Sequence, residues 1–234
     1  ILKQNLGDVM TDNNKEQKKT ASEKISNFLA KYRFFLIGII VACIVVAIVL
    51  GIVLTVMDSS KEKALSQLDK IVYSLTQVSA EELPAAQDKA LDDILALTQG
   101  KGGKVAKVRG NMAAAEIYFS RQQWQEACDA WLNAALADEK AYTAAVCYFN
   151  AAVAYEELGN SEAALANYEK VLQDSECLFV PRAIFSLGRI NESLNDYATA
   201  SNWYNKLVDE YASDNWASLA KSRLIELEIE SKIQ

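Results

Sequence analysis

Three segments of the chain repeat one pattern of small and large residues, at intervals of 37 and 36 positions. When the segments are aligned from Val108, Ala145 and Pro181, their eighth and twentieth positions hold only Ala or Gly, and their twenty-fourth position is always aromatic. A repeat of this length is typical of stacked helical hairpins, in which small residues let paired backbones approach and large residues fill the space between pairs. The residues at the eighth, twentieth and twenty-fourth positions are Ala115, Ala152, Gly188, Ala127, Ala164, Ala200, Trp131, Tyr168 and Tyr204.

The centre of the middle segment shows where a hairpin turns. Helix formers occupy residues 152–172 on both sides of Gly159 and Asn160, and Gly followed by Asn commonly ends one helix and starts another. Beyond Asp58 no strand-like alternation of any length occurs, and the two prolines of the chain are Pro84 and Pro181. The sequence therefore predicts an all-α fold.

An uncharged apolar run precedes the repeats. Residues 34–57 are 24 positions without a charge, and a helix of that length measures about 36 Å, enough for a bilayer core of about 30 Å. A cleaved signal peptide would have a shorter apolar core nearer the start of the chain, and a buried helix of a soluble protein would have a polar face. We therefore predict a single transmembrane helix.

Basic residues flank this run unequally. Five lie closely before it and three follow at a similar distance, which predicts a cytoplasmic amino terminus. Residues 1–33 hold seven of the 24 basic and four of the 31 acidic residues, so 17 basic and 27 acidic residues remain for the rest. This acidic balance disfavours a nucleic-acid partner. The basic residues before and after the run are Lys18, Lys19, Lys24, Lys31, Arg33, Lys61, Lys63 and Lys70.

These patterns divide the chain into six parts. We expect a flexible cytoplasmic tail, an amphipathic juxtamembrane helix, the transmembrane helix, a helical pair that could be a degenerate repeat, three helical hairpins and a capping helix. In the same order these parts cover residues 1–20, 21–33, 34–57, 58–104, 105–214 and 215–234.

Catalytic chemistry finds little support in the composition. The chain has no His, the commonest general base and metal ligand, so no catalytic, metal or cofactor site is predicted and an enzyme is not expected. Cys43 lies in the apolar run, which leaves Cys128, Cys147 and Cys177 outside it. Three cysteines cannot all pair within one chain, and buried small hydrophobes are the expected reading, although the sequence leaves one disulfide open.

The order small, aromatic, small, aromatic, small across each hairpin resembles the tetratricopeptide repeat (TPR) family. The chain departs from the family pattern in the interval between repeats, at Asn191 in place of an aromatic residue, and at Glu139, Glu176 and Ala212 in place of a late Pro. The resemblance implies a TPR α-solenoid that binds other proteins.

The resemblance also places a groove on the first helix of each hairpin, at its fifth, ninth and twelfth positions. Apolar side chains at these positions predict a partner-binding groove for a nonpolar peptide segment, unless the protein's own helices at residues 61–99 cover it. Recognition of a free carboxylate is not expected, because Met112 and Glu116 stand where basic and amide groups would be needed. The predicted groove residues are the apolar Met112, Phe119, Phe149, Val153 and Phe185, with Arg182 and Arg189 near one end.

A cytosolic tail, one span and a small acidic repeat domain together resemble the ancillary SecYEG translocon subunit family (YfgM-like) of the bacterial inner membrane. This resemblance implies a periplasmic repeat domain that acts as a scaffold beside the secretion channel, with SecYEG and periplasmic chaperones as partners. Two alternatives remain open: a scaffold of a pilus, flagellar or division complex, and a regulator whose repeats face the cytosol.

Overall fold

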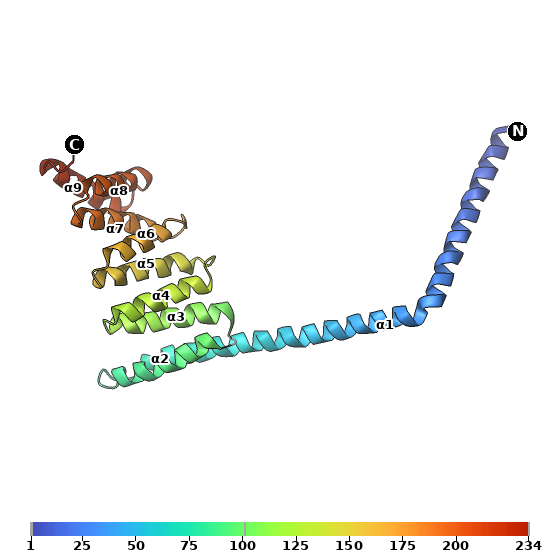
Figure 1. The fold of residues 1–234 in the computed structure, drawn as a ribbon, viewed down its shortest axis with the longest axis horizontal. Helices are drawn as coiled ribbons and strands as arrows, with labels where there is room; N and C mark the ends of the chain where they lie inside the picture. The colour runs from blue at the N-terminus through green and yellow to red at the C-terminus, as the bar shows by residue number, and fades with distance from the viewer. Residues whose placement is uncertain (1, 101, 234) are drawn as a thin grey trace. The chain divides into compact units, whose positions relative to one another are not determined.

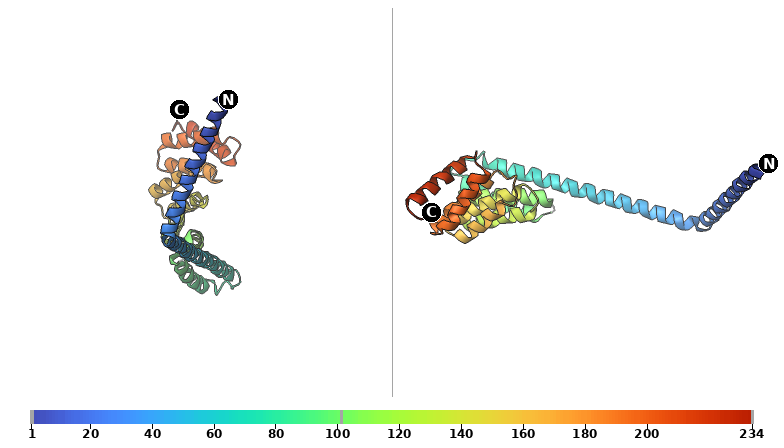
Figure 2. Two further views of the ribbon diagram at one scale, coloured as in Figure 1. Left: turned by 90° about the vertical axis from the view of Figure 1, so that its right-hand side faces the viewer. Right: turned by 90° about the horizontal axis from the view of Figure 1, so that it is seen from above.

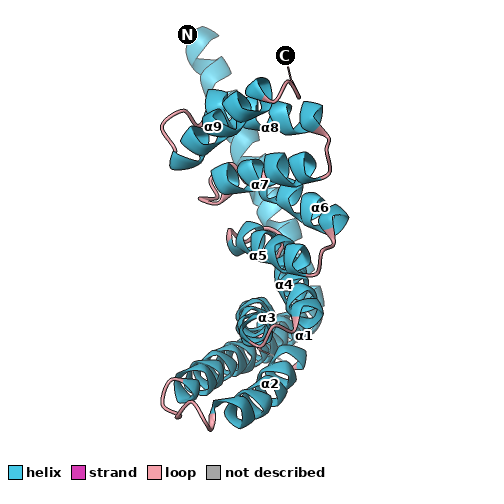
Figure 3. Ribbon diagram, turned by 90° about the vertical axis from the view of Figure 1, so that its left-hand side faces the viewer, coloured by secondary structure: helices cyan, strands magenta, loops and turns pink. Residues whose placement is uncertain are grey.

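The computed structural model describes residues 2–100 and 102–233, with side chains from residue 23 onward. Its described residues form helices joined by short connections, without strands (Figure 3). They fall into two compact units, Ile1–Val56 and Met57–Gln234. The helices are α1 (Leu2–Leu75), α2 (Leu83–Gln99), α3 (Gly103–Ser120), α4 (Trp124–Ala137), α5 (Thr143–Glu157), α6 (Ser161–Val171), α7 (Val180–Ser193), α8 (Tyr197–Glu210) and α9 (Asn215–Ile229).

Helix α1 begins earlier than the sequence patterns indicate. Residues 2–20, which we expected to form a flexible tail, are helical and continue without a break into the apolar run. Their lack of an apolar period suggested a tail, but Lys, Glu and Gln are good helix formers, and extending an existing helix costs less than starting one. Within α1, the stretch Glu23–Leu75 is long and apolar enough to cross a membrane, judged by length and composition. Its 18 consecutive residues of highest mean hydropathy include no buried residue.

The end of α1 and helix α2 form the first hairpin of the second unit. Leu68 of α1 and both Leu91 and Ile94 of α2 are buried together in one core with residues of α3, α4 and α5. Ser79 and Glu82 have the spacing of a capping box, but they do not start α2 in this way. Glu82 makes no side-chain cap, and α2 instead begins at Leu83 with Pro in its first turn, where a fixed φ and a missing N–H suit the helix.

Helices α2 to α9 pack mainly on their neighbours in chain order, as the ribbon of the second unit shows (Figure 1). The left view of Figure 2 shows the same succession of α3 to α9, from green below to red above. One buried core joins α1 to α5 and a second joins α5 to α9. This is the architecture of an α-solenoid, in which each hairpin buries its apolar faces against the next.

The small positions of the repeat are buried as predicted. Gly188 shows why size matters there: a methyl group on its Cα would lie 2.4 Å from Cε1 of Tyr204 on the facing helix. The turn at Gly159 is also confirmed, with φ +71°, a value that glycine adopts without strain. Asn160 then caps α6 by accepting a hydrogen bond from the backbone N–H of Ala163 at 3.1 Å.

Candidate interaction surface on the repeats

The predicted groove residues do not form one open column, because Phe149 is only 2% exposed. Its ring stacks on that of Phe179, with the two centroids 4.7 Å apart, and meets Tyr168 edge-on at 5.4 Å. Phe185 is half-buried, and its ring lies 5.1 Å from that of Trp216. Both side chains therefore serve the packing of the second and third repeats.

Arg182 covers part of this aromatic cluster. Its guanidinium lies over the ring of Phe149 at 5.0 Å and over that of Trp216 at 5.6 Å. The groups that cover Phe149 come from α6, from α7 and from the connection before α7. Residues 61–99 are not in the buried cluster that contains Phe149, and their helix α2 packs on α3. Met112, at the other end of the predicted groove, is half-buried against the first core.

Phe119 and Val153 are the two predicted groove residues that meet around a cavity. It has a volume of about 300 Å³ and lies among helices α3, α4 and α5; we call it the α3–α5 pocket. Trp131 forms part of the wall and is 4% exposed, and its indole Nε1 has no hydrogen-bond partner among the described residues. The pocket is lined by Glu116, Phe119, Ser120, Trp131, Asn150 and Val153.

Glu116 gives this pocket its charge. Among the described residues no cation pairs with its carboxylate, although the side chain is exposed at the pocket wall. Partial desolvation at the pocket wall raises the pKa of the Glu116 carboxyl group, because a desolvated carboxylate is harder to ionise. A partner with a basic or N–H group opposite Glu116 would therefore find an unpaired acceptor.

A polar network that sequence reasoning missed joins each of the later repeats to the helix that follows. The Tyr204 hydroxyl donates to Glu192 Oε2 at 2.9 Å, and the Arg223 guanidinium pairs with the same carboxylate. Glu192, Tyr204 and Arg223 come from α7, α8 and α9, so the network holds three consecutive helices together. We call this arrangement the Tyr–Glu–Arg clasp.

The same clasp occurs one repeat earlier. The Tyr168 hydroxyl donates to Glu156 Oε1 at 2.6 Å, and Arg189 pairs with Glu156 Oε2. Burial and the hydrogen bond to Glu156 raise the pKa of Tyr168, so the phenol stays a donor. Arg189, predicted as a groove residue, thus helps to hold α5, α6 and α7 together. The sequence contains a sign of this network, because the Glu of both clasps stands at the twelfth position of its repeat and the Tyr at the twenty-fourth.

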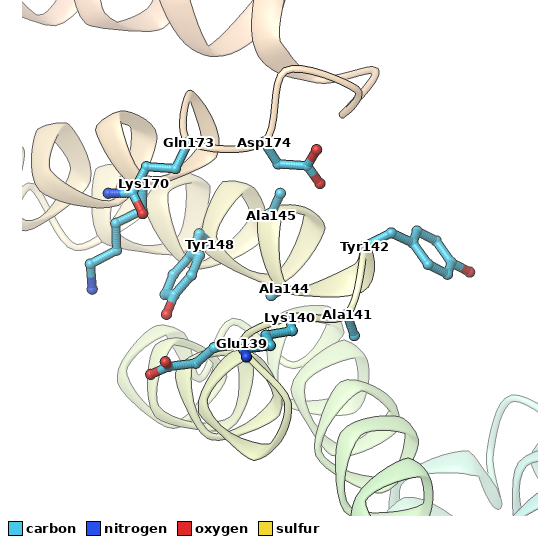
Figure 4. Close-up of a pocket in the computed structure, with 10 residues that line it drawn as sticks. All are labelled: Glu139, Lys140, Ala141, Tyr142, Ala144, Ala145, Tyr148, Lys170, Gln173 and Asp174. Atoms are coloured by element: carbon cyan, nitrogen blue, oxygen red, sulfur yellow. The ribbon is translucent and has the colours of Figure 1, made fainter.

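A larger hollow of about 490 Å³ lies beside the α4–α5 and α6–α7 connections (Figure 4). Acidic and basic side chains both line it, and the Tyr142 ring points away from Tyr148 and Lys170. The Lys170 ammonium already lies over the Tyr148 ring at 4.7 Å. Such mixed charge favours no one class of ligand. The lining residues are Glu139, Lys140, Ala141, Tyr142, Ala144, Ala145, Tyr148, Lys170, Gln173 and Asp174.

The cysteines have the character of packing residues. All four are free; Cys128 and Cys147 are buried as predicted, and Cys177 is half-buried. Burial raises the pKa of the Cys128 and Cys147 thiols to about 12, so both stay protonated at neutral pH and are poor nucleophiles and metal ligands. Within the described part of the chain, no group of three or more His, Cys, Asp or Glu side chains could hold a metal ion.

Comparison with known proteins agrees with the repeat architecture. A family model described as tetratricopeptide repeat matches residues 145–173 and 181–214, close to the second and third predicted repeats. A TPR repeat-containing protein of Treponema pallidum (strain Nichols) is 27% identical over 224 residues, which cover 88% of this chain and 94% of that protein. Proteins with such repeats generally bind other proteins and are not enzymes. The second unit is therefore an all-α solenoid that is similar to tetratricopeptide repeats at residues 145–173 and 181–214, a kind of repeat that is typical of protein-interaction scaffolds.

Proposed function

We propose that this protein is a single-pass membrane protein that presents its TPR solenoid to other polypeptides in the periplasm. The observation that carries the proposal is the helical stretch between residues 34 and 57, where 24 uncharged positions expose nearly all of their apolar side chains. Exposing such a surface to water costs about 25 cal/mol of free energy for each Å² of apolar area, whereas contact with lipid chains does not have this cost.

Protein export is the process that we propose for this scaffold. The arrangement of an amino-terminal segment, one span and an acidic repeat domain resembles ancillary subunits of the SecYEG translocon, so SecYEG and periplasmic chaperones are the proposed partners. Scaffolding of a pilus, flagellar or division complex would use the same anchor. A regulator with cytosolic repeats would reverse the orientation, which makes orientation the first property to test.

Cysteine labelling tests the anchor and its orientation. Leu178, 93% exposed between α6 and α7, would be replaced by Cys in a Cys177→Ser background, and Thr11→Cys would serve as the matched variant before the span. A maleimide that cannot cross membranes should label L178C in spheroplasts and T11C only after lysis. The opposite pattern would place the repeats in the cytosol, and labelling of both before lysis would refute a membrane span.

Photo-crosslinking in membranes tests the scaffold role. A benzoylphenylalanine would be placed at Ser120, which lines the α3–α5 pocket, and separately at Tyr142, which is 80% exposed. We expect light-dependent adducts with channel subunits, periplasmic chaperones or exported chains, identified by mass spectrometry. Adducts with pilus, flagellar or division components would favour the alternative scaffold, and the absence of protein adducts at both positions would contradict the proposed function.

A further inference from the structure

Two side chains of the second unit are more exposed than any other large apolar side chain among the described residues. Leu178 is 93% exposed and Tyr142 is 80% exposed, whereas no side chain of the apolar run exceeds 75%. Leu178 lies in the α6–α7 connection and Tyr142 in the α4–α5 connection, where its ring points away from the neighbouring side chains (Figure 4). Single exposed apolar residues are common on protein surfaces, so what these two indicate depends on where they lie.

Both residues lie in connections that are longer than the turns inside the hairpins. The turns of the hairpins α3–α4, α5–α6 and α7–α8 have three residues each, whereas the α4–α5 connection has five and the α6–α7 connection has eight. Three residues are therefore enough to reverse the chain between packed helices of this domain. The additional residues of the longer connections lie at the ends of the hairpins, and the most exposed of them are apolar.

A series of contacts leads from the end of the predicted span to these connections. Met57 is the last residue of the predicted span and the first residue of the second unit. One helical turn later, Lys61 lies beside the start of α3, because a methyl group on Cα of Gly103 would lie 3.3 Å from Cγ of Lys61. The next residue, Lys104, pairs with Asp138 of the α4–α5 connection at 3.5 Å.

The hollow of about 490 Å³ continues this series to the α6–α7 connection. Its lining includes residues 139–142 of the α4–α5 connection and both Gln173 and Asp174 of the α6–α7 connection. Figure 1 shows these two connections on the same side of the second unit. We call this side the connection edge, and it comprises Lys61 and residues 102–105, 136–142 and 172–179.

The connection edge is apolar at its tips and nearly neutral in charge. Val105 and Leu136, at helix ends on this edge, are exposed in addition to Tyr142 and Leu178. Three basic and four acidic side chains leave a formal net charge of −1, so strong electrostatic attraction to an anionic surface is not expected. These charged residues are Lys61, Lys104, Lys140, Asp138, Glu139, Asp174 and Glu176.

We infer that the connection edge rests on the bilayer that the span crosses, with Tyr142 and Leu178 in the layer of lipid head groups. Tyrosine suits this layer because its ring is apolar and its hydroxyl is polar, and leucine gains free energy by leaving water. At this depth both side chains stay in reach of water, so a maleimide or a partner protein can still contact them. The inference rests on the proposed membrane anchor and adds a second contact with the same bilayer.

The test measures how close the connection edge comes to lipid, with the full chain reconstituted in phosphatidylcholine liposomes. A nitrobenzoxadiazole fluorophore would be attached to Ser175→Cys, exposed in the α6–α7 connection, or to Glu162→Cys, exposed near the turn between α5 and α6 on the opposite edge. Both chains would carry Cys43→Ser and Cys177→Ser, whereas the two buried cysteines would stay.

A lipid with a nitroxide on its head group should quench the fluorophore at S175C at least threefold more strongly than the fluorophore at E162C, because nitroxide quenching acts only over a short range. Equal quenching at the two positions would overturn the inference. This comparison leaves Tyr142 and Leu178 in place, so it does not depend on the folding of a variant of either residue.

Two pairs of substitutions test whether the apolar tips cause the contact. Tyr142→Ser with Leu178→Ser should reduce the quenching at S175C to the level at E162C. Leu158→Ser with Leu194→Ser removes two exposed apolar side chains from turns on the opposite edge and should leave the quenching at S175C unchanged. Quenching that survives the first pair, or that both pairs abolish equally, would overturn the inference.

The lipid composition separates apolar contact from attraction by charge. Replacing a third of the phosphatidylcholine by phosphatidylglycerol should leave the quenching at S175C unchanged, because the connection edge is nearly neutral. Quenching that occurs only with the anionic lipid would overturn the inference.

Flotation of the liposomes after carbonate extraction distinguishes this inference from the proposed anchor. A chain that floats with the liposomes while both fluorophores are quenched equally would retain the anchor and reject the second contact. A chain that does not float would reject both. Protein adducts from Tyr142 in membranes, together with equal quenching in liposomes, would assign the connection edge to a protein partner and overturn the inference.

Discussion

Replacing Gly188 by Ala should lower the free energy of unfolding of the repeat domain by about 3 kcal/mol, the upper end of the usual cost of overpacking. The added methyl group would lie 2.4 Å from Cε1 and 2.7 Å from Cδ1 of Tyr204, well inside van der Waals contact. The Tyr204 ring cannot move aside easily, because it is fully buried and its hydroxyl is bound to Glu192. The gain in helix propensity, about 1 kcal/mol, offsets only part of the clash.

Tryptophan fluorescence during unfolding in urea measures this change in the full chain. All four tryptophans lie between residues 124 and 216, so the signal reports on the repeats and not on the apolar helix. Asn205→Ala, at an exposed position of α8, is the matched control and should leave stability equal or slightly higher. A stability for G188A within about 0.5 kcal/mol of the unsubstituted chain, the range expected of surface changes, would show that α7 and α8 are not packed this closely.

Replacing Glu192 by Gln should lower the free energy of unfolding by about 2 kcal/mol at pH 7, the range for hydrogen bonds to a charged group. The Glu192 carboxylate is mostly buried, with 13% of the side chain exposed, and it accepts hydrogen bonds from both Tyr204 and Arg223. An amide in its place would carry no charge for Arg223 and would leave a largely buried site poorly paired. Glu210→Gln, exposed at the end of α8, should change stability by less than about 0.5 kcal/mol.

The effect of Glu192→Gln should depend on pH in a defined direction. Burial alone would raise the pKa of Glu192, but the hydrogen bonds from Arg223 and Tyr204 outweigh it and lower the pKa in the folded state. The carboxylate therefore contributes its stability above its unfolded pKa of about 4.3, and this contribution is lost as the pH falls through the lower folded pKa. Urea unfolding between pH 7 and pH 3 should show the stability difference between the two chains shrinking only below about pH 4.5. A difference that stays constant to pH 3 would exclude a charged clasp.

The positions of the helices and turns depend on short-range properties, and this is why the sequence predicted them well. The repeat of small and aromatic residues is visible without a structure, and Gly159 can be assigned to a turn because a positive φ suits glycine. The prediction of a flexible tail at residues 2–20 was wrong, and this error also concerns a short-range property. Its lack of an apolar period was weighed above its helix propensity, although the neighbouring helix can extend into it.

The sequence by itself determined an all-α chain of repeated hairpins preceded by one long apolar helix, because helix propensity, turn residues and residue size act over a few positions. Only the tertiary structure decided which predicted groove residues are open to a partner. Phe149 is covered by Phe179 and Arg182, whereas Phe119 and Val153 border a cavity. Burial depends on side chains brought together from separate helices, and the repeat pattern of one segment contains no measure of how well its neighbours fill the space.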